Sequence, residues 1–130
     1  PELAFYEEMT AAENLAFAAE TRGLADRDGA AGAALARVGL AARGGDRVAA
    51  YSSGMKQRLR LAFALLHGPA LLLLDEPGSH LDAAGRGLVR EVVRAHARTG
   101  LVVLATNDPE ERALAERDIA LGGRGLGDPA

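Results

Sequence analysis

The 130-residue sequence is long enough for one domain, or part of one, with a modest hydrophobic core. Its formal net charge is −3, and its acidic residues are interspersed with arginines, so nothing in the charge pattern indicates a nucleic-acid partner. The absence of cysteine excludes a disulfide scaffold and a thiolate zinc site, and no apolar run approaches the roughly 20 residues needed to cross a bilayer. We therefore expect a soluble chain that reaches a membrane only through a partner.

The first half of the sequence has the pattern of an all-helical piece. Thr10 followed by Glu13 is a capping box, which predicts the start of a helix. Glycines and aspartates interrupt the pattern twice, so three helices are expected here. Their predicted ends lie near Thr21, Val38 and Leu66.

The second half alternates between strand and helix patterns, which indicates a parallel sheet. The predicted elements are a strand at residues 70–74, a helix at 83–98, a strand at 101–106, a short helix from Pro109 and a last strand at 118–121. The fold class is therefore α/β, with a helical subdomain at residues 1–68 and a sheet-containing part at residues 69–130. We assign no role to His96, which is expected on a solvated helix face.

Four leucines at residues 71–74 run directly into Asp75, Glu76 and a proline. An apolar run of this kind is typical of a strand buried on both faces, and open α/β sheets bind ligands where such strands end. One of two adjacent carboxylates is naturally a magnesium ligand, either direct or through water, and the other a general base. We assign Asp75 to the first role and Glu76 to the second, as in the Walker B arrangement of nucleotide triphosphatases. The alternative is a strand end that carries solvated acids.

Upstream, residues 51–58 precede an apolar helical pattern and place small residues at a helix N-terminus. Free backbone amides and the positive end of the helix dipole bind phosphate there, and Ser52 adds a hydroxyl donor. The alternative is that Ser52 is an ordinary N-cap and Gly54 a packing residue.

Taken together, these residues resemble the ATP-binding cassette (ABC) ATPases, whose signature runs Leu-Ser-Gly-Gly-Gln. Residues 51–55 read Tyr-Ser-Ser-Gly-Met, and the Asp-Glu-Pro triplet at residues 75–77 follows at the family's usual distance. Residues 79–82 are similar to the D-loop, and Asn107 stands where the family usually has a histidine. The opening residues 5–15 also resemble the start of the helical subdomain of transporter ATPases.

The resemblance implies a P-loop NTPase-type sheet, with ATP and Mg²⁺ as ligands. Glu76 and Asn107 would then be catalytic, and Asp75 would be associated with the metal. The residues implied in nucleotide binding are Ser52, Ser53, Gly54, Met55, Asp75 and Asp82. The implied partners are a second ATPase subunit, facing the first head to tail, and an integral membrane permease. This would hold the protein in the cytoplasm, at the inner face of the cell membrane.

No Gly-x-x-x-x-Gly-Lys-Ser/Thr loop occurs in the sequence, and the only lysine is Lys56. The family's order would place this loop before Pro1, so we expect a C-terminal portion of an ATPase domain that is inactive by itself. A naturally truncated, non-hydrolysing protein is the alternative.

Three functions compete. The opening segment favours an exporter-type ABC transporter ATPase. A soluble ABC ATPase that works on nucleic acid or ribosomes is the second, but the coiled coil, basic arm or second cassette that such proteins usually carry is not visible. The third is a catalytically silent cassette, which Asn107 and the missing loop favour.

Overall fold

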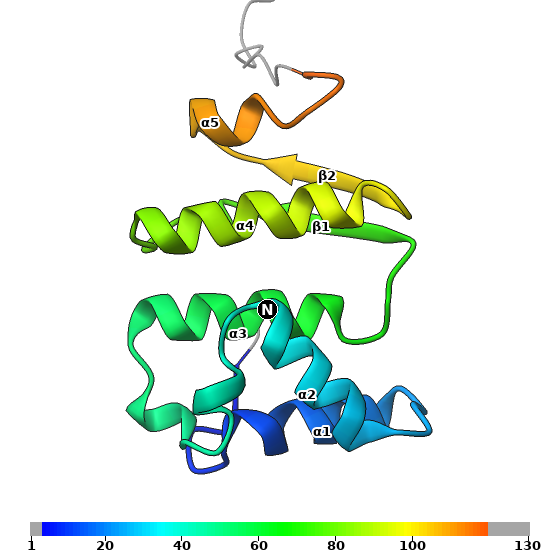
Figure 1. The fold of residues 1–130 in the computed structure, drawn as a ribbon, viewed down its shortest axis with the longest axis vertical. Helices are drawn as coiled ribbons and strands as arrows, with labels where there is room; N and C mark the ends of the chain where they lie inside the picture. Colours follow the sequence, from blue (N-terminus) through cyan, green and yellow to red (C-terminus); the bar gives the residue numbers. More distant parts are fainter. Residues whose placement is uncertain (1–3, 120–130) are drawn as a thin grey trace, which may run out of the picture.

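The computed structural model describes residues 4–119. In Figure 1 the first three helices form the lower part of the molecule, and the strands with the last two helices form the upper part. The elements are helices α1 (Ala11–Thr21), α2 (Arg27–Arg37) and α3 (Ser53–Leu65), 3-10 turns η1 (Ala41–Arg43) and η2 (Val48–Ala50), strand β1 (Leu71–Asp75), helix α4 (Ala83–His96), strand β2 (Leu101–Ala105) and helix α5 (Pro109–Arg112).

Helix α1 begins with the predicted capping box. The Thr10 hydroxyl accepts a hydrogen bond from Glu13 N (3.1 Å), and the Glu13 carboxylate accepts one from Thr10 N (2.7 Å). Donation to the carboxylate lowers the pKa of Glu13, with the Thr10 backbone N–H as the largest cause. The box satisfies helix amides that would otherwise lack partners, and it fixes where α1 starts.

Asn14 attaches the segment before α1 to the helical part. Its buried side-chain amide accepts from Tyr6 N (2.9 Å) and donates to the carbonyls of Tyr6 (3.0 Å) and Thr10 (2.9 Å). The three hydrogen bonds offset the free energy lost when the polar side chain is removed from water, and they order the backbone that it contacts.

The core of the lower part lies between α1, α2 and α3. It is built from small and branched apolar residues, and its largest fully buried side chains include Leu15, Val38, Val48 and Leu59. Many alanines lie on the facing sides of α1 and α2, which lets the two helices approach closely.

Strands β1 and β2 pair in parallel, with Leu71 opposite Leu101 and Asp75 opposite Ala105. Helix α4 connects them and packs against β2 (Figure 1). This mixture of helices with a small parallel sheet confirms the predicted α/β fold class, a partial P-loop NTPase-type sheet. The predicted strand at residues 118–121 is not formed at Asp118 and Ile119, and its remainder lies outside the described residues.

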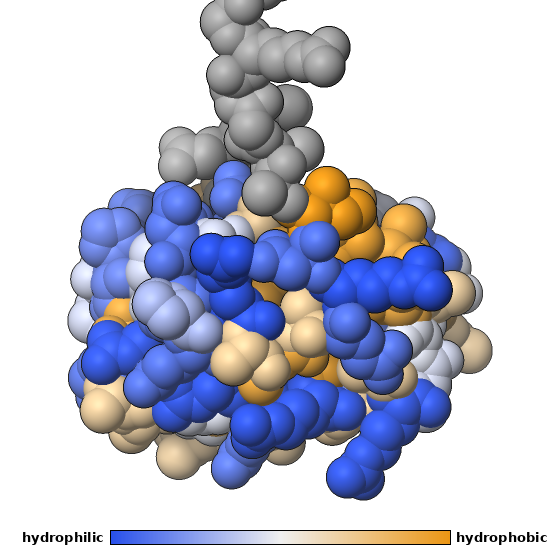
Figure 2. Space-filling model, turned by 90° about the horizontal axis from the view of Figure 1, so that it is seen from above, coloured by the Kyte–Doolittle hydropathy of each residue, from blue (hydrophilic) through white to orange (hydrophobic). Residues whose placement is uncertain are grey.

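One face of the sheet is apolar and uncovered by the described part of the chain. Because side chains alternate along a strand, the pairs Leu71 with Leu101 and Leu73 with Val103 share this face. All four are exposed, and Leu73 is 66% exposed, whereas Leu72 on the other face is buried. Seen from the end of the molecule that carries α5, apolar surface gathers on one side (Figure 2). We call these four residues the open sheet face.

The expectation for His96 is wrong. The residue is only 5% exposed, because the chain folds back over the last turn of α4 to begin β2. Thr99 N and Gly100 N both donate to the carbonyl of His96, and a Cβ placed on Gly100 would lie 3.0 Å from His96 Nε2. The helical pattern placed His96 on the outer face, but it carried no information on this tight connection. Within residues 4–119, no helix combines the length and the apolar character needed to span a membrane.

Candidate functional site

The start of α3 has the form expected of an anion-binding helix end. Ser52 is the N-cap, and its Oγ accepts from Met55 N (3.2 Å). Tyr51 lies just before it, buried in the core, and its hydroxyl donates to the carbonyl of Arg43 (2.8 Å); burial raises the pKa of Tyr51. Tyr51 therefore anchors the loop from inside, while Ser52 and Ser53 remain exposed with the first helix amides.

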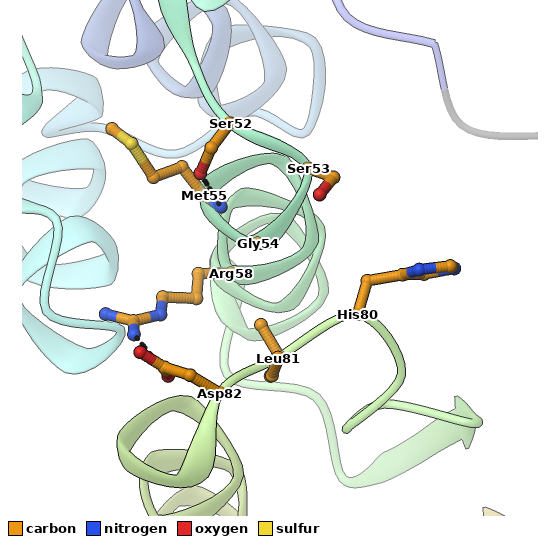
Figure 3. Close-up of a pocket in the computed structure, with 8 residues that line it drawn as sticks. All are labelled: Ser52, Ser53, Gly54, Met55, Arg58, His80, Leu81 and Asp82. Atoms are coloured by element: carbon orange, nitrogen blue, oxygen red, sulfur yellow. Dashed lines mark hydrogen bonds and ion pairs between the residues drawn. The ribbon is translucent and has the colours of Figure 1, made fainter.

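A hollow of about 300 Å³ joins this helix end to the loop before α4 (Figure 3). We call it the signature hollow, and its lining residues are Ser52, Ser53, Gly54, Met55, Arg58, His80, Leu81 and Asp82. Two sequence motifs predicted as separate thus share one surface. A methyl group on Gly54 would make only ordinary contacts with His80 O (3.5 Å) and Leu81 Cδ2 (3.6 Å), so available space does not explain the glycine.

Asp82 holds the far side of the signature hollow. Its Oδ1 accepts from Gly85 N (2.7 Å), which caps α4, and lies 3.6 Å from Arg58 NH2 (Figure 3). Asp82 is therefore the N-cap of α4. Sequence reasoning missed Arg58, although its position one turn after the motif places it on the same helix end.

The carboxyl end of β1 carries the second group of predicted residues. Glu76 N donates to Ala105 O (2.8 Å), which continues the strand pairing by one residue, and Glu76 then turns with a φ of 43°. Asp75 is exposed and Glu76 is half-buried. A positive φ in a residue other than glycine is unfavourable and clusters at functional sites.

Asn107 lies directly against Glu76. Its backbone N (2.9 Å) and its side-chain Nδ2 (3.0 Å) both donate to Glu76 Oε1. The residues on either side of Asn107 fix its position. Thr106 Oγ1 accepts from Asp108 N, and Asp108 caps α5 by accepting from Glu110 N. The catalytic role that the resemblance implies for Asn107 stays a prediction.

The two groups of predicted residues do not meet in one cavity. Asp75, Glu76 and Asn107 are not among the residues that line the signature hollow. Within residues 4–119, no group of three or more histidine or carboxylate side chains could hold a metal. A single exposed carboxylate, Asp75, nevertheless fits Mg²⁺, which keeps several waters and takes its other ligands from substrate phosphates.

Comparison with known proteins agrees with these observations. The sequence model of the family described as "ABC transporter" matches residues 2–79, which is more than half of the chain and includes both the start of α3 and Glu76. The chain belongs to the ABC transporter family. The predicted resemblance is thereby confirmed, and the family implies ATP binding.

Several curated proteins are similar over most of the chain. It is 45% identical over 106 residues to the uncharacterized ABC transporter ATP-binding protein YxlF of Bacillus subtilis, covering 80% of this chain and 36% of that protein. It is 38% identical over 108 residues to the linearmycin resistance ATP-binding protein LnrL of the same species, covering 82% and 35%. It is 47% identical over 97 residues to the aliphatic sulfonates import ATP-binding protein SsuB of Escherichia coli K12, covering 71% and 37%. The chain therefore spans about a third of the length of the curated relatives it matches.

Proposed function

We propose that this chain supplies parts of two ATP sites in the ATP-hydrolysing subunit of an ABC transporter. The observation that carries the proposal is the separation of the signature hollow from the Glu76–Asn107 pair within one chain of this family. Residues on two separate surfaces of one chain would serve two different nucleotides when two subunits face each other head to tail. In this arrangement, Ser52 to Met55 would close over the ATP held by the partner.

At the signature hollow, the recognition would be electrostatic. Ser52 would present its hydroxyl to the γ-phosphate, and Ser53 and Gly54 would present helix amides, with the helix dipole behind them. Met55, whose N donates to Ser52 Oγ, would hold that hydroxyl in place. Asp82 would lie along the interface between the subunits and would keep Arg58 in place. Fixed donors of this kind stabilise the charge of phosphoryl transfer without reorganisation.

At the end of β1, Glu76 would act as the base for the attacking water. Oε1 of Glu76 accepts two hydrogen bonds from Asn107, whereas Oε2 of Glu76 forms no hydrogen bond with the described residues. Oε2 is therefore the oxygen that can accept a proton. Asp75 would hold Mg²⁺, directly or through water. When bound, the ion would neutralise charge on the phosphate oxygens.

An aromatic hollow of about 260 Å³ is the proposed contact with a membrane permease. Its lining includes Phe5, Tyr6, Phe17 and Phe63, which are drawn from the opening segment, α1 and α3. Tyr6 and Phe17 are both exposed and meet edge to face with their ring centroids 5.9 Å apart. Exposed aromatic clusters are typical of protein interfaces. Such a partner would hold the protein at the cytoplasmic face of the cell membrane.

We also propose the division into a helical subdomain at residues 1–68 and a core part at residues 69–130. The proposed direction of transport is export, which the opening segment and the similarity to a resistance protein support. The similarity to a sulfonate import protein supports the opposite direction. Substrate uptake into inverted membrane vesicles, driven by ATP, distinguishes export from import.

The experiment that tests the shared sites uses mixed dimers of the full-length protein. Ser52→Arg puts a bulky cation where the helix end and the phosphate must approach, so the homodimer should lose ATP turnover. A variant of the phosphate-binding loop should be inactive as well. In a mixed dimer of the two, one site carries both lesions and the other is intact, so activity should partly return. A mixed dimer as inactive as both parents would contradict the proposal.

A further inference from the structure

Glu111 is a buried acid to which nothing above gives a role. It lies on α5 and is only 3% exposed, and its Oε2 has no hydrogen-bond partner among the described residues. Its neighbour Glu110 is exposed and pairs with Arg90, as is usual for a surface acid. An unpaired buried oxygen is uncommon in folded proteins, and each case calls for a structural or catalytic reason.

The Glu111 side chain packs into the turn that follows β1. A Cβ placed on Gly78 would lie 2.3 Å from Glu111 Oε1 and 3.5 Å from its Cδ, so the carboxyl group occupies the space that a side chain at Gly78 would need. Gly78 does not have a positive φ. A methyl group at position 78 would therefore force the Glu111 carboxyl group to shift, so the close approach of Glu111, and not the backbone conformation, accounts for glycine here.

The turn itself is strained at both ends. Glu76 has a φ of 43° and His80 a φ of 62°, and neither is a glycine. Such conformations persist only where the surroundings hold them. On either side of Gly78, Gln57 Nε2 donates to Pro77 O (3.3 Å) and Arg86 NH1 donates to Leu81 O (2.8 Å).

We propose that Glu111 is a positioning residue for Glu76. The carboxyl group supports the middle of the turn at Gly78, while Asn107 holds Glu76 itself, so that the base keeps its direction at the end of β1. This inference rests on the proposed function and adds a residue to it. The support is steric and comes from the shape of the side chain, so the amide of glutamine should replace the carboxyl group.

The test is a double-mutant cycle in the full-length protein, with ATP turnover and KM measured for each variant. Gly78→Ala should lower kcat by roughly ten- to hundred-fold with KM changed less than about two-fold, because small displacements of a catalytic group have large effects on rate. Glu111→Ala should also lower kcat. The double variant should be more active than Gly78→Ala, because removing the carboxyl group makes room for the new methyl group. Glu111→Gln should stay close to the parent.

Two matched controls belong to the cycle. Gly45→Ala adds a methyl group with no neighbour within 4 Å, and Glu110→Ala removes the exposed acid of the same short helix. Both should leave kcat nearly unchanged. Independent, additive effects of Gly78→Ala and Glu111→Ala would overturn the proposal, as would full activity of Glu111→Ala.

The unfolding midpoint of each variant separates the two proposals. If the parent protein shows no turnover above its Glu76→Gln variant, the proposed function fails; a non-additive shift of the midpoints would still show that Glu111 occupies the space at Gly78. The parent protein could also hydrolyse ATP while the cycle gives non-additive midpoints but additive kcat values. In that case Glu111 has a purely structural role and the positioning proposal is wrong.

Discussion

Glu76 and Asn107 lie 31 residues apart in the chain, yet two hydrogen bonds from Asn107 converge on a single oxygen of Glu76. The parallel register of β1 and β2 brings their ends level, and the turn after each strand brings the two side chains together. One of the two donors is a backbone N–H, which no substitution other than proline removes. The pair therefore combines a contact that depends on the side chain with one that does not.

Variants of Asn107 should separate these contacts. Asn107→Ala keeps the backbone donor and should lower kcat about ten-fold with little change in ATP affinity. Asn107→Asp has nearly the same shape but places a carboxylate against Glu76, so like-charge repulsion should lower kcat further. Asn107→His introduces the residue that the family usually has here and should raise kcat modestly, because the longer, protonated side chain would add a charge-assisted hydrogen bond to the γ-phosphate. Steady-state kinetics on the full-length protein gives the order. If Asn107→Ala and the parent protein are equally inactive and Asn107→His restores turnover, the catalytically silent cassette is the better interpretation.

Replacing Glu76 by glutamine should remove the base and little else. The amide oxygen of glutamine can still accept from both donors of Asn107, so the turn should keep its geometry. Turnover should fall by roughly two to four decades, the usual contribution of a positioned base. ATP binding, measured by equilibrium titration of the full-length variant, should survive. Loss of ATP affinity would instead make Glu76 a binding residue.

Variants of Asp82 should separate the stability that comes from its N-cap hydrogen bond from the stability that comes from its ion pair with Arg58. Asp82→Asn retains a good N-cap but loses the ion pair with Arg58, which is worth less than about 1 kcal/mol because Asp82 is largely exposed. Asp82→Ala also loses the hydrogen bond from Gly85 N and should reduce the free energy of unfolding by about 1 kcal/mol more. Urea unfolding of the three forms measures both effects. Equal losses for asparagine and alanine would mean that the cap contributes nothing.

The 130-residue chain by itself should not hydrolyse ATP. It contains no loop of the Gly-x-x-x-x-Gly-Lys-Ser/Thr type, so most of the stabilisation of the transferred phosphoryl group is missing. Phosphate release by the purified chain in the presence of Mg²⁺ should equal that of its Glu76→Gln variant. Turnover above that control would show that this chain completes an active site by another route.

The open sheet face should bind a hydrophobic dye in the isolated chain. Exposed apolar patches mark interfaces, and threonine preserves the strand preference of Leu73 and Leu101 while removing much of their apolar surface. The double replacement by threonine should therefore reduce the fluorescence of bound anilinonaphthalene sulfonate and raise solubility. Ile119→Thr, which changes an exposed side chain outside this face, is the control. Unchanged dye binding by the double variant would place the apolar surface elsewhere.

The sequence predicted those features that depend on short-range patterns. The capping box at Thr10, the helix ends and the bounds of the strand that runs into Asp75 all follow from neighbouring residues, and the structure agrees to within about two residues at most ends. The expectation that this strand is buried on both faces is wrong for the described residues, because Leu71 and Leu73 are exposed. The role of Asp82 as a cap could be predicted for the same reason.

Other relationships depend on how distant segments meet. The contact between Asn107 and Glu76 needs the strand register, and the close approach of Glu111 to Gly78 needs the position of α5. Burial of His96 depends on the tight connection into β2. A periodic pattern on one helix says which residues share a face, but it does not say what covers that face.

Gln57 gives the start of α3 a direct connection to the turn that carries Glu76. Its side chain comes from the first turns of α3, whose end would face one nucleotide in the proposed dimer, and it donates to the carbonyl of Pro77, the residue after Glu76, which would serve the other nucleotide. A rotation of α3 must either break this bond or move the turn with it. In a head-to-tail dimer, occupancy of one site would therefore change the rate at the other through the interior of a single subunit, and Gln57→Ala should lower the Hill coefficient for ATP.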